Sequence, residues 1–87
     1  MAYVQVLKAT MTQERITTMT VALHGLADRE LDRATVIAWM KDGHSFLPIS
    51  DGRVGPALRM LEVDGEAFIR SDSEASAADV LPKALIR

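Results

Sequence analysis

The 87-residue chain contains no cysteine. This absence excludes a disulfide framework and a thiolate metal site, either of which would help to stabilise so small a domain. It is consistent with a reducing compartment. One packed core must therefore supply the stability, and we expect residues 1–87 to form a single domain with little stability in reserve.

Runs of one charge and long apolar runs are also absent. Lysines and arginines are scattered singly, and the formal net charge is −2. Nucleic-acid binding needs clustered cations that displace phosphate counterions, so this pattern argues against a nucleic-acid partner. The charge-free runs are too short to cross a bilayer, and the first residues lack the blocks of a signal peptide. We therefore expect a cytoplasmic domain without a membrane partner.

The composition is otherwise that of a globular domain, with 48% apolar and 25% charged residues. No repeat, linker or low-complexity stretch divides the chain. Residues 71–78 (SDSEASAA) are small and polar, and we expect a loop there.

Two segments near the N-terminus have the alternation of strands. In residues 3–9, Val4 and Val6 share one face. Residues 15–23 are dense in β-branched side chains, with Met19 and Val21 on one face. Residues 10–14 are polar and without periodicity, so we interpret them as the connection of an opening hairpin.

A helix is predicted over residues 32–42. Three apolar residues fall at i, i+1 and i+4 and so share one helical face: Val36, Ile37 and Met40. Asp32 and Asp28 are both candidate N-caps, which leaves the start of the helix open between them. Gly43 stands where a C′ residue adopts the left-handed conformation.

The segment after the helix predicts a short strand, residues 45–49, that Pro48 interrupts. Proline has no N–H to donate to a ladder, which indicates a sheet edge or a bend. Asp51–Gly52 and Gly55–Pro56 mark two irregular points beyond it.

Residues 57–63 have the propensity of a helix, but Asp64–Gly65 and residues 66–70 follow them. This two-residue turn signal favours a hairpin and makes residues 57–63 a strand. Pro82 redirects the tail, residues 81–87. The sequence does not decide whether this tail forms a strand, a helix or a cap on the core. The resulting order is ββαβββ, an α+β domain with a mostly antiparallel sheet and one main helix on one face.

These pieces together resemble a known family. The resemblance is carried by Val36-Ile37, Lys41-Asp42-Gly43, Phe46, Asp64-Gly65, Phe68-Ile69-Arg70-Ser71-Asp72, Asp79 and Leu81-Pro82. Over residues 15–82 they are similar to the small bacterial domains grouped as DUF3892. In that family a hairpin precedes a V-I-x-x-I-x-x-G helix, and a "y-I-R-T-D" strand and a closing "D-N-L-x-x-L-P" follow.

The chain departs from the family pattern at two positions and in the shortened spacing of its last motif, Asp79-Val80-Leu81-Pro82. Ser71 stands where the family usually has threonine, and Val80 stands where it has asparagine. If the family's Asp-Asn pair pins the C-terminus, this chain must pin it in another way. The family has no established activity, so the resemblance implies an architecture and no catalytic residues.

Histidines and carboxylates are the first candidates for chemistry. His24 and Asp28 have an i, i+4 spacing, but Gly25 and the lack of further ligands disfavour a metal site. His44 precedes Ser45, and adjacent strand residues point to opposite faces, which disfavours a base–nucleophile pair. Carboxylates cluster around the predicted hairpin tip and the loop after it, where turn formation and solvation explain them: Glu62, Asp64, Glu66, Asp72, Glu74 and Asp79.

Arg70 is the charged residue of most interest, because it ends the strand that carries the resemblance. A guanidinium can clamp an anion or a carboxylate, and Arg59 is expected across the hairpin. The interpretation we favour is an ion pair of Arg70 with Asp72 or Asp79 that holds the final loop.

Two functions are consistent with these observations. The first is a small non-enzymatic binding domain that takes a protein partner, or self-associates, through an edge strand near Pro48. The domain would be a monomer or a weak homodimer. The second is a small-anion or small-ligand site, or a minor enzyme, built from Arg70, Arg59 and His44. We expect no cofactor and no metal.

Overall fold

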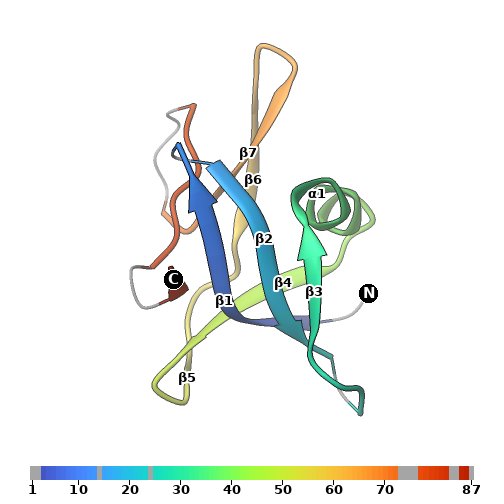
Figure 1. Cartoon of the computed structure of the whole chain (residues 1–87). Coiled ribbons are helices and arrows are strands. Elements are labelled where there is room, and N and C mark those ends of the chain that lie inside the picture. The colour runs from blue at the N-terminus through green and yellow to red at the C-terminus, as the bar shows by residue number, and fades with distance from the viewer. Residues whose placement is uncertain (1–2, 14, 24, 73–76, 83–84, 87) are drawn as a thin grey trace.

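A computed structural model describes residues 3–13, 15–23, 25–72, 77–82 and 85–86. Its elements are β1 (Tyr3–Thr12), β2 (Arg15–Ala22), β3 (Arg29–Asp32), α1 (Arg33–Lys41), β4 (Ser45–Ser50), β5 (Arg53–Val54), β6 (Arg59–Val63) and β7 (Glu66–Arg70). This part of the chain contains strands that are mostly antiparallel and a single helix (Figure 1). The predicted α+β class is therefore confirmed.

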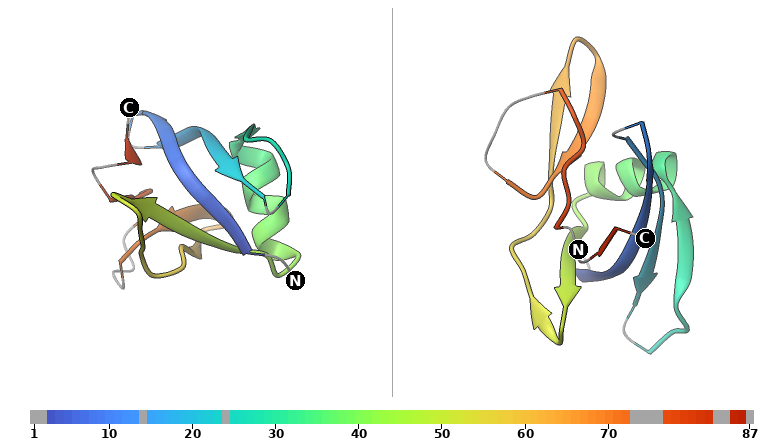
Figure 2. Two further views of the ribbon diagram at one scale, coloured as in Figure 1. Left: turned by 90° about the horizontal axis from the view of Figure 1, so that it is seen from below. Right: turned by 60° about the vertical axis from the view of Figure 1, so that its left-hand side comes forward.

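The strands form two sheets. Five strands lie in the order β3-β2-β1-β4-β5, and β6 pairs with β7 in a separate two-stranded sheet. The β1–β2 hairpin is antiparallel, as predicted, whereas β4 runs parallel to β1 after the chain has passed through α1. Figure 2 shows the β6–β7 hairpin standing apart from the larger sheet and projecting past α1.

The core lies between the inner face of the larger sheet, α1, the base of the β6–β7 hairpin and the C-terminal segment. Val4 and Val6 are buried while Tyr3 and Gln5 are exposed, as the alternation in β1 predicted. The buried cluster also includes Ala9, Ile16, Met19, Val21, Leu31, Val36, Phe46, Leu58, Ile69, Leu81 and Leu85. Apolar residues from the whole length of the chain therefore share one core.

The prediction that residues 10–14 connect the first hairpin was wrong in part. Strand β1 continues to Thr12, and a register shift lies between Val6 and Lys8 and another between Thr10 and Met11. Polar residues such as Thr10 suit a strand whose outer face meets solvent, because only the inner face needs apolar side chains.

Helix α1 begins at the predicted N-cap Asp32, whose carboxylate accepts a 2.8 Å hydrogen bond from the N–H of Thr35. The alternative start at Asp28 was wrong, because β3 (Arg29–Asp32) pairs there with β2. Only Leu31 of β3 is buried, so this strand has no alternation that the sequence could disclose. Gly43, at φ 95°, follows the helix in the left-handed conformation that was predicted.

Pro48 does not mark a sheet edge. Strand β4 pairs with β1 on one side and with β5 on the other. Pro48 lies where the β1 pairing ends, opposite Val6, and its carbonyl accepts a 2.8 Å hydrogen bond from the N–H of Gly55. The missing N–H is therefore accommodated at a point where β4 changes partners. The edge is formed by β5, a two-residue strand that was not predicted, although the turn Asp51–Gly52 leads into it.

The predicted hairpin at Asp64–Gly65 is confirmed. Residues Arg59 to Val63 pair with Arg70 to Glu66 in antiparallel register. Both turn residues have positive φ, 52° for Asp64 and 81° for Gly65, as a type I′ turn requires.

The C-terminal segment closes the core. Leu81 and Leu85 are buried, Val80 forms a parallel bridge with Arg70, and Ile86 forms one with Ala9. The tail thus acts as a cap on the core in the residues described, and residues 83–84 and 87 lie outside them. Of the predicted loop over residues 71–78, the segment 73–76 also lies outside the described residues.

Candidate functional site

The structure brings Arg70 and Arg59 together at Asp72. Arg70, which is 4% exposed, donates from Nε and Nη2 to the two carboxylate oxygens of Asp72 at 2.7 and 2.9 Å, and from Nη1 to the carbonyl of Ala78 at 2.9 Å. Arg59 lies opposite Arg70 in the ladder and donates from Nε to the carbonyl of Asp72. The ion pair of Arg70 with Asp72 that the sequence favoured is present at one end of the final loop, and the hydrogen bond of Arg70 to Ala78 holds the other end.

His44 has a different neighbourhood from the two arginines. Its ring lies 5.8 Å from that of Trp39, centroid to centroid. The two side chains line a cavity of about 170 Å³ together with Val4 and Leu23. The predicted ligand site of Arg70, Arg59 and His44 therefore divides into two groups of contacts, and its ligand-binding role stays a prediction. His24 lies outside the described residues.

The hairpin carboxylates form exposed ion pairs. Glu66 pairs with Arg15, and Glu62 lies 3.9 Å from the ammonium group of Lys41. Within the described ranges, no three histidine or acidic side chains are grouped so that they could hold a metal ion.

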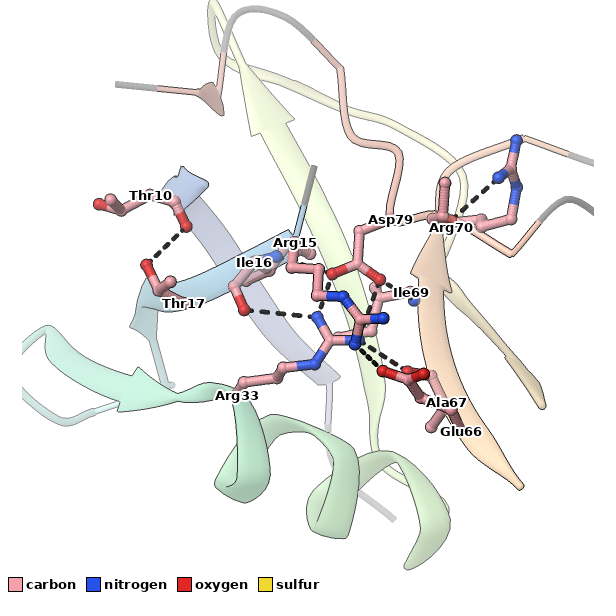
Figure 3. A network of polar contacts seen from close by, with 11 residues as sticks. Thr10, Arg15, Ile16, Thr17, Arg33, Glu66, Ala67, Ile69, Arg70 and Asp79 are labelled. Atoms are coloured by element: carbon pink, nitrogen blue, oxygen red, sulfur yellow. Dashed lines mark hydrogen bonds and ion pairs between the residues drawn. The ribbon is translucent and has the colours of Figure 1, made fainter. Parts of the chain in front are cut away.

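A buried ion pair between Arg33 and Asp79 lies at the centre of a network of polar contacts (Figure 3). The Asp79 side chain is 0% exposed. Its Oδ2 accepts from the N–H of Ile16 at 2.7 Å, and its Oδ1 accepts from the N–H of Ile69 at 2.9 Å. Arg33 donates to the carbonyl of Ile16 at 3.3 Å and to the carbonyl of Ala67 at 2.7 Å. The pair therefore satisfies four backbone groups as well as its own charges.

These four backbone groups belong to two strands that do not pair with each other. Ile16 lies in β2, and Ala67 and Ile69 lie in β7. The guanidinium–carboxylate pair thus supplies the hydrogen bonds that a strand between β2 and β7 would otherwise make. From the sequence, Asp79 was expected to pair with Arg70 or to contribute to the turn and solvation of the final loop, and the role of Arg33 was missed. The one available signal was an arginine at the first position of the predicted helix, which is not specific.

The contacts of β7 establish which way the peptide groups of the hairpin point. A two-residue turn is closed by a pair that exchanges both hydrogen bonds, here Val63 and Glu66, and the pairs then alternate. Ala67 and Ile69 must direct their peptide groups away from β6, and they do: Arg33 and Asp79 bind them, and the N–H of Val80 donates to the carbonyl of Ile69. The outer edge of β7 is therefore bonded at the carbonyl of Ala67 and at both backbone groups of Ile69.

The same alternation places two peptide groups of β6 on its outer edge. Glu62 is opposite Ala67 and Met60 is opposite Ile69, so both direct their N–H and C=O away from β7. Leu58, two residues earlier, bonds the carbonyl of Phe46 in β4 from this side. No strand of the described ranges pairs with β6 at Met60 or Glu62. We call Met60–Val63, with these outward groups, the β6 edge.

The other sheet edges carry features that hinder pairing. Strand β3 has charged residues at three of its four positions: Arg29, Glu30 and Asp32. Strand β5 has two residues and is followed by Gly55–Pro56. An open hollow of about 520 Å³ lies beside it, lined by Pro48, Val54 and Pro82 among others. Short length, charge and proline are devices that protect edges. The β6 edge is longer than β5, has no lysine or proline, and contains Met60, Leu61 and Val63.

Comparison with known proteins found no match to a family model, to a curated protein or to a solved structure. The resemblance to the DUF3892 domains therefore stays a prediction. Across the part of the chain that the structure describes, no helix combines the length and the apolar character needed to span a bilayer.

Proposed function

We propose that this chain is a non-enzymatic protein-interaction domain, and that its β6 edge binds an extended segment of a protein partner. The observation that carries the proposal is the pair of outward peptide groups at Met60 and Glu62, which have no strand partner among the described residues. A bound segment would add a third strand to the β6–β7 sheet. We retain the cytoplasm as its expected location.

Strand addition suits the chemistry of this edge. Main-chain hydrogen bonds to Met60 and Glu62 would supply affinity, and side chains beside Leu61 and Val63 would supply selectivity. All three apolar side chains of the edge are half-buried, so a neighbouring strand would remove apolar surface from water. Exposed edges of this kind are normally protected unless pairing is their role.

The second function, an anion or small-ligand site around Arg70, Arg59 and His44, has weaker support. Arg70 is buried with three of its donors directed at Asp72 and Ala78, so an anion would have to displace them. His44 contributes to an apolar cavity lined by Trp39 and Leu23, which suits a small apolar group better than an anion.

A photocrosslinker placed on the β6 edge tests the proposal. Glu62 is exposed, so we would replace it with p-benzoylphenylalanine in the full chain expressed in cells, and place the same group at Leu26 as a control. Leu26 is 64% exposed and lies in the segment between β2 and β3, away from the β6 ladder. We expect a discrete adduct from position 62 and none from position 26.

The adduct should also depend on the backbone of β6. For this test the crosslinker is placed at Val63, and Glu62→Pro is introduced into the same chain. Proline removes the outward N–H of residue 62 and leaves the β6–β7 hydrogen bonds in place, and it is tolerated at such a position. We expect the adduct to disappear while circular dichroism stays that of the folded domain. Equal adducts at positions 62 and 26, or an adduct that survives Glu62→Pro, would count against strand addition.

A further inference from the structure

Resting on the proposed function, we infer that the strand received by the β6 edge is β6 of a second copy of this chain. The two copies would be related by a two-fold axis that passes between their Leu61 residues. Their hairpins would join into one four-stranded antiparallel sheet in the order β7-β6-β6-β7.

The outward peptide groups of β6 match those of a second copy. In an antiparallel pair about a two-fold axis at Leu61, Met60 lies opposite Glu62 of the second copy, and Glu62 lies opposite Met60 of the second copy. Both outward residues of each copy then meet outward residues of the other. Each such pair exchanges two hydrogen bonds, so all four outward N–H groups of the two copies are satisfied.

Neighbouring two-fold registers do not achieve this. An axis at Met60 would place Glu62 opposite Leu58 of the second copy, whose N–H is already bonded to Phe46. An axis at Glu62 would place two carboxylates directly opposite each other, and would set Met60 against the turn residue Asp64, which is at φ 52°. The register at Leu61 is the one that the backbone and the charges both permit.

The side chains fit this register. Leu61 faces Leu61 of the second copy in a non-hydrogen-bonded pair, in which side chains are closest. Glu62 faces Met60 of the second copy rather than a second carboxylate. The ammonium group of Lys41, 3.9 Å from Glu62, reduces the remaining repulsion between the two glutamates.

The tip of the β6–β7 hairpin is the part of the edge that stands away from the other elements. Figures 1 and 2 both show the turn of the β6–β7 hairpin projecting beyond the β1–β2 hairpin and α1. The β6 edge is short, however, and the new ladder contains four hydrogen bonds. We therefore expect a weak, concentration-dependent dimer rather than an obligate one.

A single cysteine tests both the contact and its register. Because the chain has no cysteine, Leu61→Cys introduces the only thiol. Opposed residues of a non-hydrogen-bonded pair have Cα atoms about 4.5 Å apart, within the range that a disulfide spans. We expect Leu61→Cys to form a covalent dimer under mild oxidation at least about tenfold faster than either control, Met60→Cys or Glu62→Cys, whose diagonal thiols are too far apart.

The outcomes are distinct. Fast dimerisation of Met60→Cys or Glu62→Cys would show another register and overturn the inference, as would equal slow rates for all three variants. Amide hydrogen exchange of the unaltered chain is the second measurement, and it needs no substitution. Raising the concentration should protect the amides of Met60 and Glu62, while Leu61 and Val63 are protected throughout. Unchanged exchange at Met60 and Glu62 would also overturn it.

The result separates this inference from the proposed function. If the crosslinker at position 62 captures another protein and Leu61→Cys does not dimerise, the edge binds a foreign strand and the self-pairing is wrong. If neither experiment gives an adduct, the proposed function is wrong as well.

Discussion

At the scale of single residues, Asp32 decides where the helix begins. Its backbone is extended, at φ −79° and ψ 170°, and its carboxylate accepts the otherwise unpaired N–H of Thr35. Hydrogen bonds from the side chain and then the backbone of Thr35 hold the pKa of Asp32 below its ordinary value of 3.8, although the carboxylate is exposed. A fully solvated side chain thus stabilises the helix through its charge.

We predict that the cap makes stability fall in acid. The folded-state pKa of Asp32 is lowered, so its contribution is present above the unfolded value of 3.8 and is lost as the pH falls through the lower folded value. Asp32→Asn keeps an N-cap oxygen without the charge, so its urea midpoint should fall less between about pH 5 and about pH 2 than that of the unaltered chain. Equal falls in both chains, or an NMR titration of Asp32 at or above 3.8, would contradict this.

At the scale of elements, the β6–β7 hairpin was predicted and β3 and β5 were not. Asp64–Gly65 is a strong signal because few residue pairs tolerate positive φ at both positions of a type I′ turn. Strands β3 and β5 have four and two residues, and the only buried side chain in them is Leu31. Strand β3 forms because β2 is already in place to pair with it, which no local pattern encodes. Strand β5 follows Asp51–Gly52, whose φ angles of 51° and 74° are both positive, so a hairpin signal was present there and was interpreted only as an irregular point.

The turn itself can be tested at Gly65. A Cβ added there would meet no atom within 4 Å, so the cost of Gly65→Ala comes from φ alone. We expect a loss of about 1–2 kcal/mol in the free energy of unfolding, measured by urea denaturation. Asp64→Asn is the matched control, because asparagine before glycine suits this turn and should change stability by less than about 0.5 kcal/mol. A Gly65→Ala chain as stable as the control would argue that the hairpin has a different turn.

At the scale of the whole molecule, the Arg33–Asp79 pair joins the two sheets. Isolated buried ion pairs are often replaced by apolar residues without loss, because the desolvation of the charges offsets their attraction. Here the pair also bonds the N–H and C=O of Ile16, the C=O of Ala67 and the N–H of Ile69. Without it, peptide groups of two strands would be buried with no partner.

We therefore predict that Asp79→Asn destabilises the domain by about 3 kcal/mol or more, because it leaves Arg33 partly buried and uncompensated. The double variant Arg33→Met, Asp79→Leu should remain strongly destabilised, by at least about 2 kcal/mol, since the strand groups lose their partners. Glu66→Gln removes the ion pair between Glu66 and Arg15, whose side chains are 47% and 46% exposed, respectively. This control should lower the free energy of unfolding by less than about 1 kcal/mol. Urea denaturation measures all three. A double variant as stable as the unaltered chain would show that the strand edges do not depend on the pair.

From the sequence we predicted that the candidate site is a strand edge, but not which strand carries it. An edge strand was expected from Pro48, yet β4 proved internal, and the edge that we propose as the site lies in β6. Which peptide groups face outward depends on the register with β7, and whether they are covered depends on strands far away in sequence. Neither property is local. The pairing of Arg70 with Asp72, two residues apart, was accessible because it is local.

The sequence by itself determined the local units of this protein: the β1–β2 hairpin, a helix capped by Asp32, and the turn at Asp64–Gly65. Each depends on side-chain alternation, one capping oxygen or tolerance of positive φ, which act within a few residues. The tertiary structure alone decided that Arg33 and Asp79 would bridge two sheets and that no strand of the described residues would pair with β6 at Met60 or Glu62. Those features require segments up to 63 residues apart to meet, and their free energy exists only once the core has brought them together.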